Sequence, residues 1–182
     1  MREEEHERRR RFEALVAEVH DPLARYLARR APRDDVDDVL GDVLLTLWRR
    51  LDDVPGAAPV PWCYGVARRS LANHLRGNQR RLQLVRRLEA QPPVGFDASG
   101  TAEHPELAAA LEALSGSERE LVALWAWEGL EPREIAKVLG TTANAVSLRL
   151  SRVRKKLTRE IARQKGPAAG QPVGRHTGAT DE

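Results

Sequence analysis

Apolar residues recur along most of the chain at the spacing of amphipathic helices. The clearest run lies within residues 36–51, where apolar side chains follow one another at intervals of three and four positions. Its members are Val36, Val39, Leu40, Val43, Leu44, Leu47 and Leu51. This spacing predicts one buried face of a helix, and Asp34 or Asp35 is expected to cap its start. Gly41 lies inside the run and should cost about 1 kcal/mol relative to alanine.

Two more helices are predicted before this run. Residues 1–11 place glutamates and arginines four positions apart, which predicts an exposed, frayed helix. Apolar positions become periodic in residues 12–19, and Asp21-Pro22 then has the sequence of an N-cap followed by proline at the first helical position. The pattern therefore predicts that a new helix starts at Pro22 and ends near Pro32.

The rest of the chain divides into a loop, a helix and a second helical unit. Proline-rich residues 52–61 predict a loop, and residues 62–88 predict a helix whose partial apolar face is crowded by arginines. Residues 91–106 are rich in proline, glycine and small polar residues, which indicates a linker and the best domain boundary. The helical pattern resumes at Leu107, and the low apolar content after Lys165 predicts a disordered tail.

Residues 131–157 have the pattern of a helix-turn-helix. Gly140 suits the left-handed turn that ends the first helix, and Thr142 can cap the second. A capping box, Ser115 with Glu118, starts the helix that precedes this motif. The apolar positions of the last helix are Val146, Leu150, Val153 and Leu157. Its opposite face is polar and basic, as in a helix that enters the major groove, although a helical hairpin with a basic surface is the competing interpretation.

The charges are strongly segregated, although 30 basic and 27 acidic residues leave a net charge of only +3. Residues 62–87 contain seven arginines and no acid, and residues 143–163 contain seven bases and one acid. Residues 34–53, in contrast, contain seven acids and two arginines. Two basic stretches and one acidic stretch favour two polyanion contacts and a separate partner surface over simple solvated helix faces.

Composition and sequence patterns exclude several classes of protein. Aromatic residues make up only 4%, which favours small helical units over a large β-sandwich. No stretch approaches about 18 consecutive apolar residues, so no membrane span and no membrane partner is predicted. The first residues, MREEEHERRRR, lack the apolar core of a signal peptide, and we therefore expect a cytoplasmic protein. The single cysteine, Cys63, excludes an intrachain disulfide and a multi-cysteine zinc site.

The aspartates of residues 34–42 admit a second interpretation, a metal-dependent nuclease. Most of them are better explained as helix caps or solvated positions, and the five histidines are scattered along the chain. The sequence contains no evident nucleophile–base pair and no phosphate-cradling loop. We therefore expect no catalytic residue, no metal and no cofactor.

Together these motifs resemble those of a bacterial RNA polymerase sigma factor of the small extracytoplasmic-function (ECF) type. Residues 35–51 are similar to that family's core-polymerase-binding helix, and residues 61–76 to its promoter-melting, −10-reading segment. Residues 127–157 resemble its −35-reading helix-turn-helix. The resemblance implies an all-α chain of two small helical domains joined by a flexible linker, the second domain being a helix-turn-helix.

The resemblance also implies domain boundaries. They are an N-terminal extension (1–11), a sigma region 2-like domain (12–88), a linker (89–106), a sigma region 4-like domain (107–163) and a disordered tail (164–182). Several positions depart from the family pattern, among them Leu44, where phenylalanine is often found, and Ser147-Leu148, where a basic-polar pair is frequent. Gly41 stands where the family usually has glutamine, and Gly65 stands where arginine is frequent.

Roles of single residues follow from the resemblance by position. The residues implied to bind core polymerase are Asp38, Asp42, Leu45, Trp48 and Arg49. The residues implied to follow the melted −10 strand are Trp62, Arg68, Arg69, Asn73, His74 and Arg76. The residues implied to contact the −35 duplex are Thr142, Asn144, Ser147, Leu148, Arg149, Ser151, Arg152, Arg154 and Lys155. The loop 52–60 corresponds to the loop that captures an unstacked base of the non-template strand.

The implied function is to bind the clamp coiled coil and flap of core RNA polymerase, to direct it to −35/−10 promoters and to help melt the −10 region. An anti-sigma factor is a further partner that is common in the family. The main alternative is a repressor or activator that acts alone, which would keep the helix-turn-helix but would not need the acidic helix or the basic melting helix. The other alternative is an enzyme.

Overall fold

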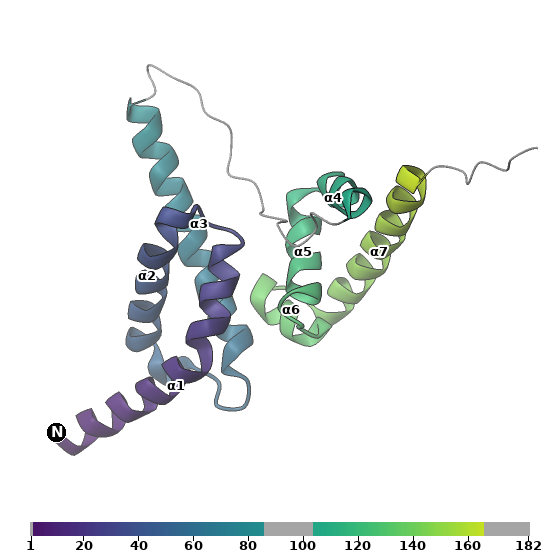
Figure 1. Cartoon of the computed structure of the whole chain (residues 1–182). Helices are drawn as coiled ribbons and strands as arrows, with labels where there is room; N and C mark the ends of the chain where they lie inside the picture. The colour runs from purple at the N-terminus through teal and green to yellow at the C-terminus, as the bar shows by residue number, and fades with distance from the viewer. Residues whose placement is uncertain (1, 86–103, 166–182) are drawn as a thin grey trace, which may run out of the picture.

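In this computed structural model, the described part of the chain, residues 2–85 and 104–165, forms helices and connecting turns (Figure 1). The first unit contains α1 (Arg2–Ala28), η1 (Arg33–Asp35), α2 (Val36–Arg49), η2 (Leu51–Asp53) and α3 (Pro59–Val85). The second unit contains α4 (Pro105–Glu112), α5 (Gly116–Ala126), α6 (Pro132–Leu139) and α7 (Ala143–Lys165). The predicted all-α fold of two helical units is confirmed.

Some predicted segments lie mostly or wholly outside the described residues. They are the linker at 89–106, the end of the third helix near residue 88, and the tail at 164–182.

The first helix, α1, is continuous where the sequence predicts a new start. It includes the segment predicted to be frayed and runs on through Pro22, so the prediction of a helix start at that proline is wrong. A proline inside a helix removes one backbone hydrogen bond and disfavours the preceding turn. Burial offsets this loss, because Val19, Leu23 and Leu27 around the proline are almost completely shielded from water.

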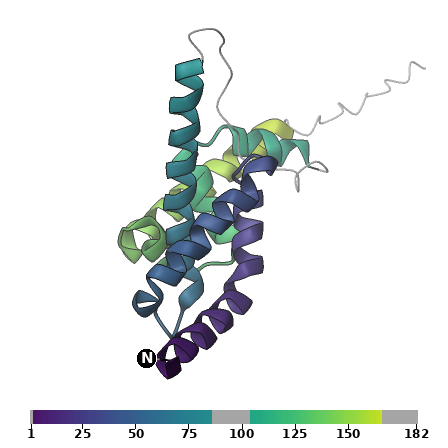
Figure 2. The same cartoon turned by 90° about the vertical axis from the view of Figure 1, so that its left-hand side faces the viewer.

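The three long helices of the first unit pack side by side (Figure 2). The predicted apolar stripe of α2 forms much of their shared core, and Val39, Val43 and Leu47 are fully buried. Asp35 occupies the N-cap position of α2, but its side chain makes no capping hydrogen bond. Its carboxylate instead accepts a hydrogen bond of 3.2 Å from the side chain of Asn78 in α3. The Asp35 side chain therefore links α2 to α3 instead of capping α2.

The loop between α2 and α3 is shorter than the predicted 52–61. Its first residues belong to the 3-10 turn η2, and α3 already begins at Pro59. Pro59 and Pro61 are compatible with the first turn because backbone N–H groups there have no partner within the helix. The predicted start at Trp62 is therefore too late by three residues.

The local signals of the second unit are confirmed. Both hydrogen bonds of the capping box are present: the Glu118 amide donates to Ser115 Oγ over 3.3 Å, and the Ser115 amide donates to Glu118 Oε2 over 2.8 Å. Gly140 ends α6 in the left-handed conformation, with φ of 66°. Thr142 Oγ1 then accepts a hydrogen bond of 3.2 Å from the amide of Ala145 and so caps α7.

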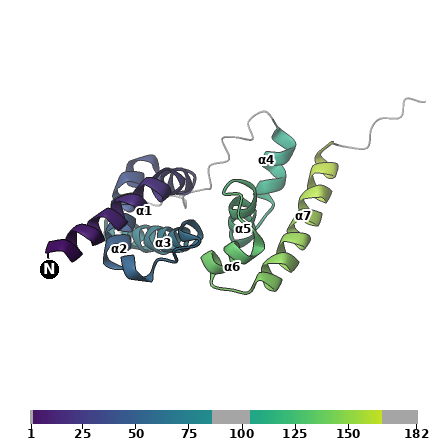
Figure 3. The same ribbon diagram turned by 90° about the horizontal axis from the view of Figure 1, so that it is seen from below.

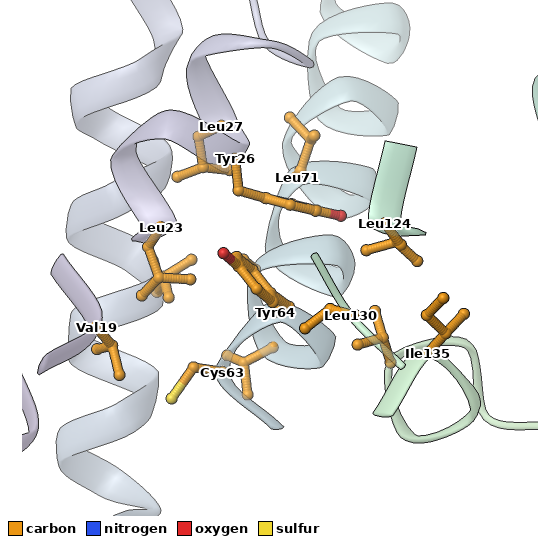
Figure 4. Packing of buried hydrophobic residues seen from close by; sticks show 14 of the residues in the cluster. Val19, Leu23, Tyr26, Leu27, Cys63, Tyr64, Leu71, Leu124, Leu130 and Ile135 are labelled. Atoms are coloured by element: carbon orange, nitrogen blue, oxygen red, sulfur yellow. The ribbon is translucent and has the colours of Figure 1, made fainter. Parts of the chain in front are cut away.

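The two units pack against each other through α3 and α6 (Figures 1 and 3). The helices approach closely at Gly65, where an added Cβ would lie 3.8 Å from the Cα of Val138. Figure 4 shows the ring of Tyr26 of α1 extending toward Leu124 of the second unit. Because Tyr64, Leu124 and Leu130 belong to one cluster of buried residues, the apolar core is continuous across both units.

Candidate nucleic-acid and partner interfaces

The helix α7 presents a broad face to solvent. It is anchored by Val146, Leu150 and Val153, which are buried, whereas Leu148 on the other side is 51% exposed. The other exposed residues of the predicted set are Thr142, Asn144, Ser147, Arg149, Ser151, Arg152, Arg154 and Lys155. The structure thus brings the whole predicted −35 set together on the outer side of one helix and its cap. Hydroxyl, methyl and guanidinium groups on one helix face can read base edges and contact phosphates in a major groove.

A groove that the sequence does not signal lies along this face. Its volume is about 940 Å³, and its walls include Trp125 of α5 together with Ser151 and Arg154 of α7. The guanidinium carbon of Arg154 lies 5.3 Å from the centre of the Trp125 ring, within cation–π range. Trp125 is 41% exposed, so its ring contacts the Arg154 side chain at the surface and does not fill the core.

A second exposed face lies along α3. Arg69, Asn73 and Arg76 follow one another at intervals of four and three residues and are all exposed, as is Arg68. The Arg76 guanidinium donates a hydrogen bond of 2.6 Å to the side-chain oxygen of Asn73, which orders both groups. This stripe combines cations with an amide, which suits contacts to a nucleic acid backbone and to base edges.

Two residues of the predicted −10 set, His74 and Trp62, are not part of the exposed stripe on α3. His74 is mostly buried, and its Nε2 lies 3.2 Å from a carboxylate oxygen of Asp35 and 3.0 Å from the side-chain nitrogen of Asn78. It therefore lies apart from the exposed stripe and ties α3 to the start of α2. Trp62 is half-buried, and the guanidinium carbon of Arg50 lies 5.1 Å from its ring centre.

The outer face of α2 combines acidic and apolar groups. Asp38, Asp42, Leu45 and Arg49 recur at intervals of four, three and four residues, and all are exposed. Leu45 is 53% exposed and, with Trp125 and Leu148, is one of the large apolar side chains that the described residues leave exposed. An exposed leucine beside carboxylates suits a partner surface that offers both an apolar contact and cations.

Trp48, predicted to belong to the same face, packs inward beneath α1 instead. Its ring meets Phe12 edge to face, with ring centres 5.1 Å apart. The guanidinium of Arg8 lies 5.1 Å from the Trp48 ring centre and donates a hydrogen bond of 2.8 Å to the Trp48 carbonyl. Trp48 thus holds the N-terminal part of α1 against the end of α2.

The single cysteine is a buried packing residue. The Cys63 side chain is fully buried, and burial, assisted by the charge of Glu18, raises its pKa from 9.0 to about 12. The thiol therefore stays protonated near neutral pH, and it has neither the exposure nor the low pKa of a reactive cysteine.

Comparison with known proteins identifies the family. Residues 15–81 match the family described as Sigma-70 region 2, and residues 104–157 match Sigma-70, region 4. The RNA polymerase sigma factor CnrH of Cupriavidus metallidurans is 30% identical over 165 residues, which cover 82% of this chain and 85% of that protein. The chain belongs to the sigma-70 family, as a sigma factor of the ECF type. Sigma factors direct the initiation of transcription at promoters and are not enzymes.

Other relatives agree with this assignment. The RNA polymerase sigma factor NccH of Alcaligenes xylosoxydans xylosoxydans is 29% identical to this sigma factor over 136 residues, which cover 70% of this chain and 73% of NccH. The solved structure of CnrH in complex with the cytosolic domain of CnrY superposes with a TM-score of 0.55 at 29% identity, covering 81% of this chain and 85% of that chain. The sigma factor RpoE of Bartonella quintana, solved with the anti-sigma factor NepR, has a TM-score of 0.55 at 20% identity, covering 88% and 98% of the two chains, and supports the fold alone.

Some contacts of this sigma factor have no sequence motif. Arg8 and Arg11 of α1 reach across to Asp52, the first residue of the predicted base-capturing loop, with nitrogen–oxygen distances of 2.9 and 3.2 Å. The charge pairing of residues 1–11 predicted contacts within one helix, whereas these two arginines bind an acid more than 40 positions away. In the described residues, no helix is long and apolar enough to cross a membrane.

Proposed function

We propose that this sigma factor binds core RNA polymerase through the outer face of α2, follows the melted −10 strand with α3 and reads the −35 duplex with α7. The observation that carries the proposal is that one chain holds two separate exposed faces suited to nucleic acid, on α3 and α7. A third exposed face on α2 has the opposite charge, which suits a protein partner. In this proposal residues 12–88 form the polymerase and −10 domain, and residues 107–163 form the −35 domain.

The exposed residues of α7 suggest how the −35 duplex is read. Arg152 can donate two hydrogen bonds to a guanine edge, and Leu148 can meet the methyl group of a thymine. Lys155 contributes a phosphate contact that fixes the register without reading sequence. Arg154 already contacts the Trp125 ring in the free protein, so its side chain loses less conformational entropy when it binds DNA.

The exposed stripe of α3 suits a single strand rather than a duplex. Unstacked bases gain roughly 1–3 kcal/mol each when they stack on an aromatic ring or occupy a pocket. Trp62 and the short loop between η2 and α3 offer such contacts, while Arg69 and Arg76 hold the phosphates. Binding the open strand shifts the promoter toward melting, and the polymerase carries out the chemistry.

A further proposed partner is an anti-sigma factor. The related CnrH was solved with the cytosolic domain of CnrY, and CnrH is 30% identical to this chain. Exposed apolar side chains such as Leu45 and Leu148 are available for a protein that would cover the polymerase and DNA faces. We place the protein in the cytoplasm with its polymerase.

Run-off transcription tests the proposal. Core polymerase is incubated with a genomic promoter library with and without the protein, and new transcripts are expected to share a −35/−10 pair. Asp42→Ala is expected to weaken core binding, with Asp37→Ala on the same helix as its control. Arg152→Ala is expected to weaken −35 recognition about tenfold or more, with Arg163→Ala, an exposed base farther along α7, as its control.

The outcomes separate the alternatives. No binding to core together with tight binding to duplex sites would favour a repressor or activator that acts alone. Equal effects of Arg152→Ala and Arg163→Ala would contradict the assignment of the α7 face. Transcripts that do not depend on added protein would contradict the sigma role itself.

A further inference from the structure

The N-terminal part of α1 lies outside the segment that matches the sigma-70 family. The match to region 2 begins at residue 15, whereas α1 begins at Arg2. Within residues 2–11 every side chain is exposed except that of Arg8, which is half-buried. Because a helical segment with so little buried surface is marginal by itself, its placement depends on the contacts it makes with the rest of the protein.

Two arginines of this segment bind one carboxylate beyond the end of α2. Arg8 Nη1 lies 2.9 Å from Asp52 Oδ2, and Arg11 Nη1 lies 3.2 Å from Asp52 Oδ1. The two arginines are three positions apart and therefore share one face of α1. With a guanidinium on each oxygen, the carboxylate is fixed in direction as well as in position. We call Arg8, Arg11 and Asp52 the N-terminal brace.

Arg8 also binds the end of α2. Its Nη2 donates a hydrogen bond of 2.8 Å to the Trp48 carbonyl, and its guanidinium carbon lies 5.1 Å from the centre of the Trp48 ring. Since α2 ends at Arg49, this carbonyl belongs to the last turn, where carbonyls have no partner within the helix. A cation at this end of a helix is also favoured by the helix dipole. The brace is therefore tied to a rigid element.

The contacts continue from the brace to Trp62. Asp52 is the central residue of η2, the turn from which the loop to α3 departs. The next residue, Asp53, accepts a hydrogen bond of 2.8 Å from Arg50. The guanidinium carbon of Arg50 in turn lies 5.1 Å from the centre of the Trp62 ring. A chain of contacts thus leads from the N-terminal part of α1, through η2, to the aromatic ring proposed to stack on an unstacked base.

The same contacts neutralise the acids of η2. Asp52 and Asp53 lie at the start of a loop that, under the proposed function, meets a negatively charged strand. An unpaired carboxylate at this place would repel the phosphates. Arg8 and Arg11 pair with Asp52, and Arg50 pairs with Asp53, so each acid has a basic partner. The brace therefore serves both the shape and the charge of the loop entrance.

We propose that Arg8 and Arg11 are positioning residues that hold η2 and the loop after it in the shape that captures an unstacked base of the −10 strand. This rests on the proposed function, because the captured base is assigned there to this loop and to Trp62. Exposed ion pairs contribute little to the stability of a whole fold, and these act on a turn of three residues. Their loss is therefore expected to loosen the turn without unfolding the protein.

Amide hydrogen exchange in the free protein tests the brace without polymerase or DNA. The amides of Asp53 and Val54 donate hydrogen bonds of 2.9 and 3.3 Å to carbonyls three residues earlier, which close the turn η2. Arg8→Ala is expected to speed the exchange of these two amides about three- to tenfold, because the turn opens more often. Arg11→Ala removes the 3.2 Å ion pair but leaves the contact of Arg8 with Trp48, so a smaller change in the same direction is expected.

Arg9→Ala is the matched control. It removes the same charge from the same stretch of α1, but the ion pair of Arg9, with a nitrogen–oxygen distance of 3.0 Å, is with Glu13 of that helix. No change in the exchange of the turn amides is expected. Unchanged exchange in both Arg8→Ala and Arg11→Ala would overturn the brace, and so would equal acceleration by Arg9→Ala.

Binding of the −10 strand tests the positioning role. The probe is the non-template strand of a promoter found by run-off transcription, bound to the complex of core polymerase with the protein, either intact or with one base removed at each position in turn. Arg8→Ala is expected to weaken binding of the intact strand about three- to tenfold. The loss should vanish when the captured base is the one removed and persist when any other base is removed. An equal loss on every strand would overturn the positioning role, because general loosening of the protein does not depend on one base.

A double-variant cycle distinguishes positioning from direct contact with a phosphate. If Arg11 acts through Asp52, Arg11→Ala should have no further effect on strand binding in an Asp52→Ala background. The same effect in both backgrounds would mean that Arg11 contacts DNA itself, and would overturn the proposal. Absence of run-off transcripts would remove the capture role together with the proposed function, whereas the exchange measurements on the free protein would still decide whether the brace exists.

Discussion

Gly41 and Gly140 allow the same substitution to be tested in two backbone conformations. Gly41 lies exposed in the middle of α2, and Gly140 ends α6 with φ of 66°. An added Cβ would meet no neighbouring atom within 4 Å at either position. Steric contacts are therefore matched, and the backbone conformation alone distinguishes the two sites.

The expected effects have opposite signs. Gly41→Ala replaces a poor helix former in a helix interior and should raise the free energy of unfolding by about 1 kcal/mol. Gly140→Ala forces a Cβ into the left-handed region and should lower it by about 1–2 kcal/mol. On a chain of this size, a gain of 1 kcal/mol corresponds to a rise in melting temperature of roughly 2–4 °C.

Urea unfolding followed by circular dichroism at 222 nm measures both variants against the unsubstituted protein. A neutral or destabilising Gly41→Ala would refute the continuous, solvent-facing helix described for α2. A stabilising Gly140→Ala would refute the left-handed turn. Gly41→Gln should also be stabilising, and because Gly41 lies on the same face as Asp38 and Leu45, a changed affinity for core polymerase would show that this face is in contact.

Two further predictions concern single groups. Because the pKa of Cys63 is raised from 9.0 to about 12, the folded state keeps a proton that the unfolded chain loses, so stability falls as the pH rises above 9. This contribution should reach about 1.4 kcal/mol at pH 10, and a Cys63→Ala variant with the same pH dependence in urea titrations would disprove it. Ser115→Ala should cost about 1 kcal/mol by removing the cap of α5. The Ser115 amide, and after it Lys156, lower the pKa of Glu118, so the stabilisation by Glu118 is present above the unfolded value near 4.5 and is lost as the pH falls through the lowered one. Glu118→Gln should flatten the acid limb of the stability curve, and an unchanged limb would count against the ion pair.

Features set by neighbouring residues could be predicted from sequence. The apolar spacing in α2, the capping box at Ser115 and the turn glycine at Gly140 depend on residues within a few positions of one another. Each is determined by local geometry, and each is found as predicted. Exposure of the α7 residues follows from the same logic, because the buried stripe at Val146 and Leu150 fixes the opposite face.

Features that depend on contacts between residues far apart in the chain could not be predicted from the sequence. Pro22 carries a local signal for a helix start, yet the burial of Leu23 and Leu27 keeps α1 continuous. The spacing of His74 does not reveal that Asp35 binds it. Glu120 and Glu128 of the second unit lie 90 or more positions from Arg29 and Arg30, to which they are hydrogen-bonded, and no periodicity within either unit marks these contacts.

The ion pairs between the two units make their contact more sensitive to substitution at its acids than at its leucines. Loss of one apolar side chain leaves a cavity that neighbouring atoms can partly fill. Loss of Glu128, whose side chain is 2% exposed, removes a carboxylate from both Arg29 and Arg30 in a buried place. Sequence drift at this contact is therefore expected to be tolerated at its leucines and restricted at its acids.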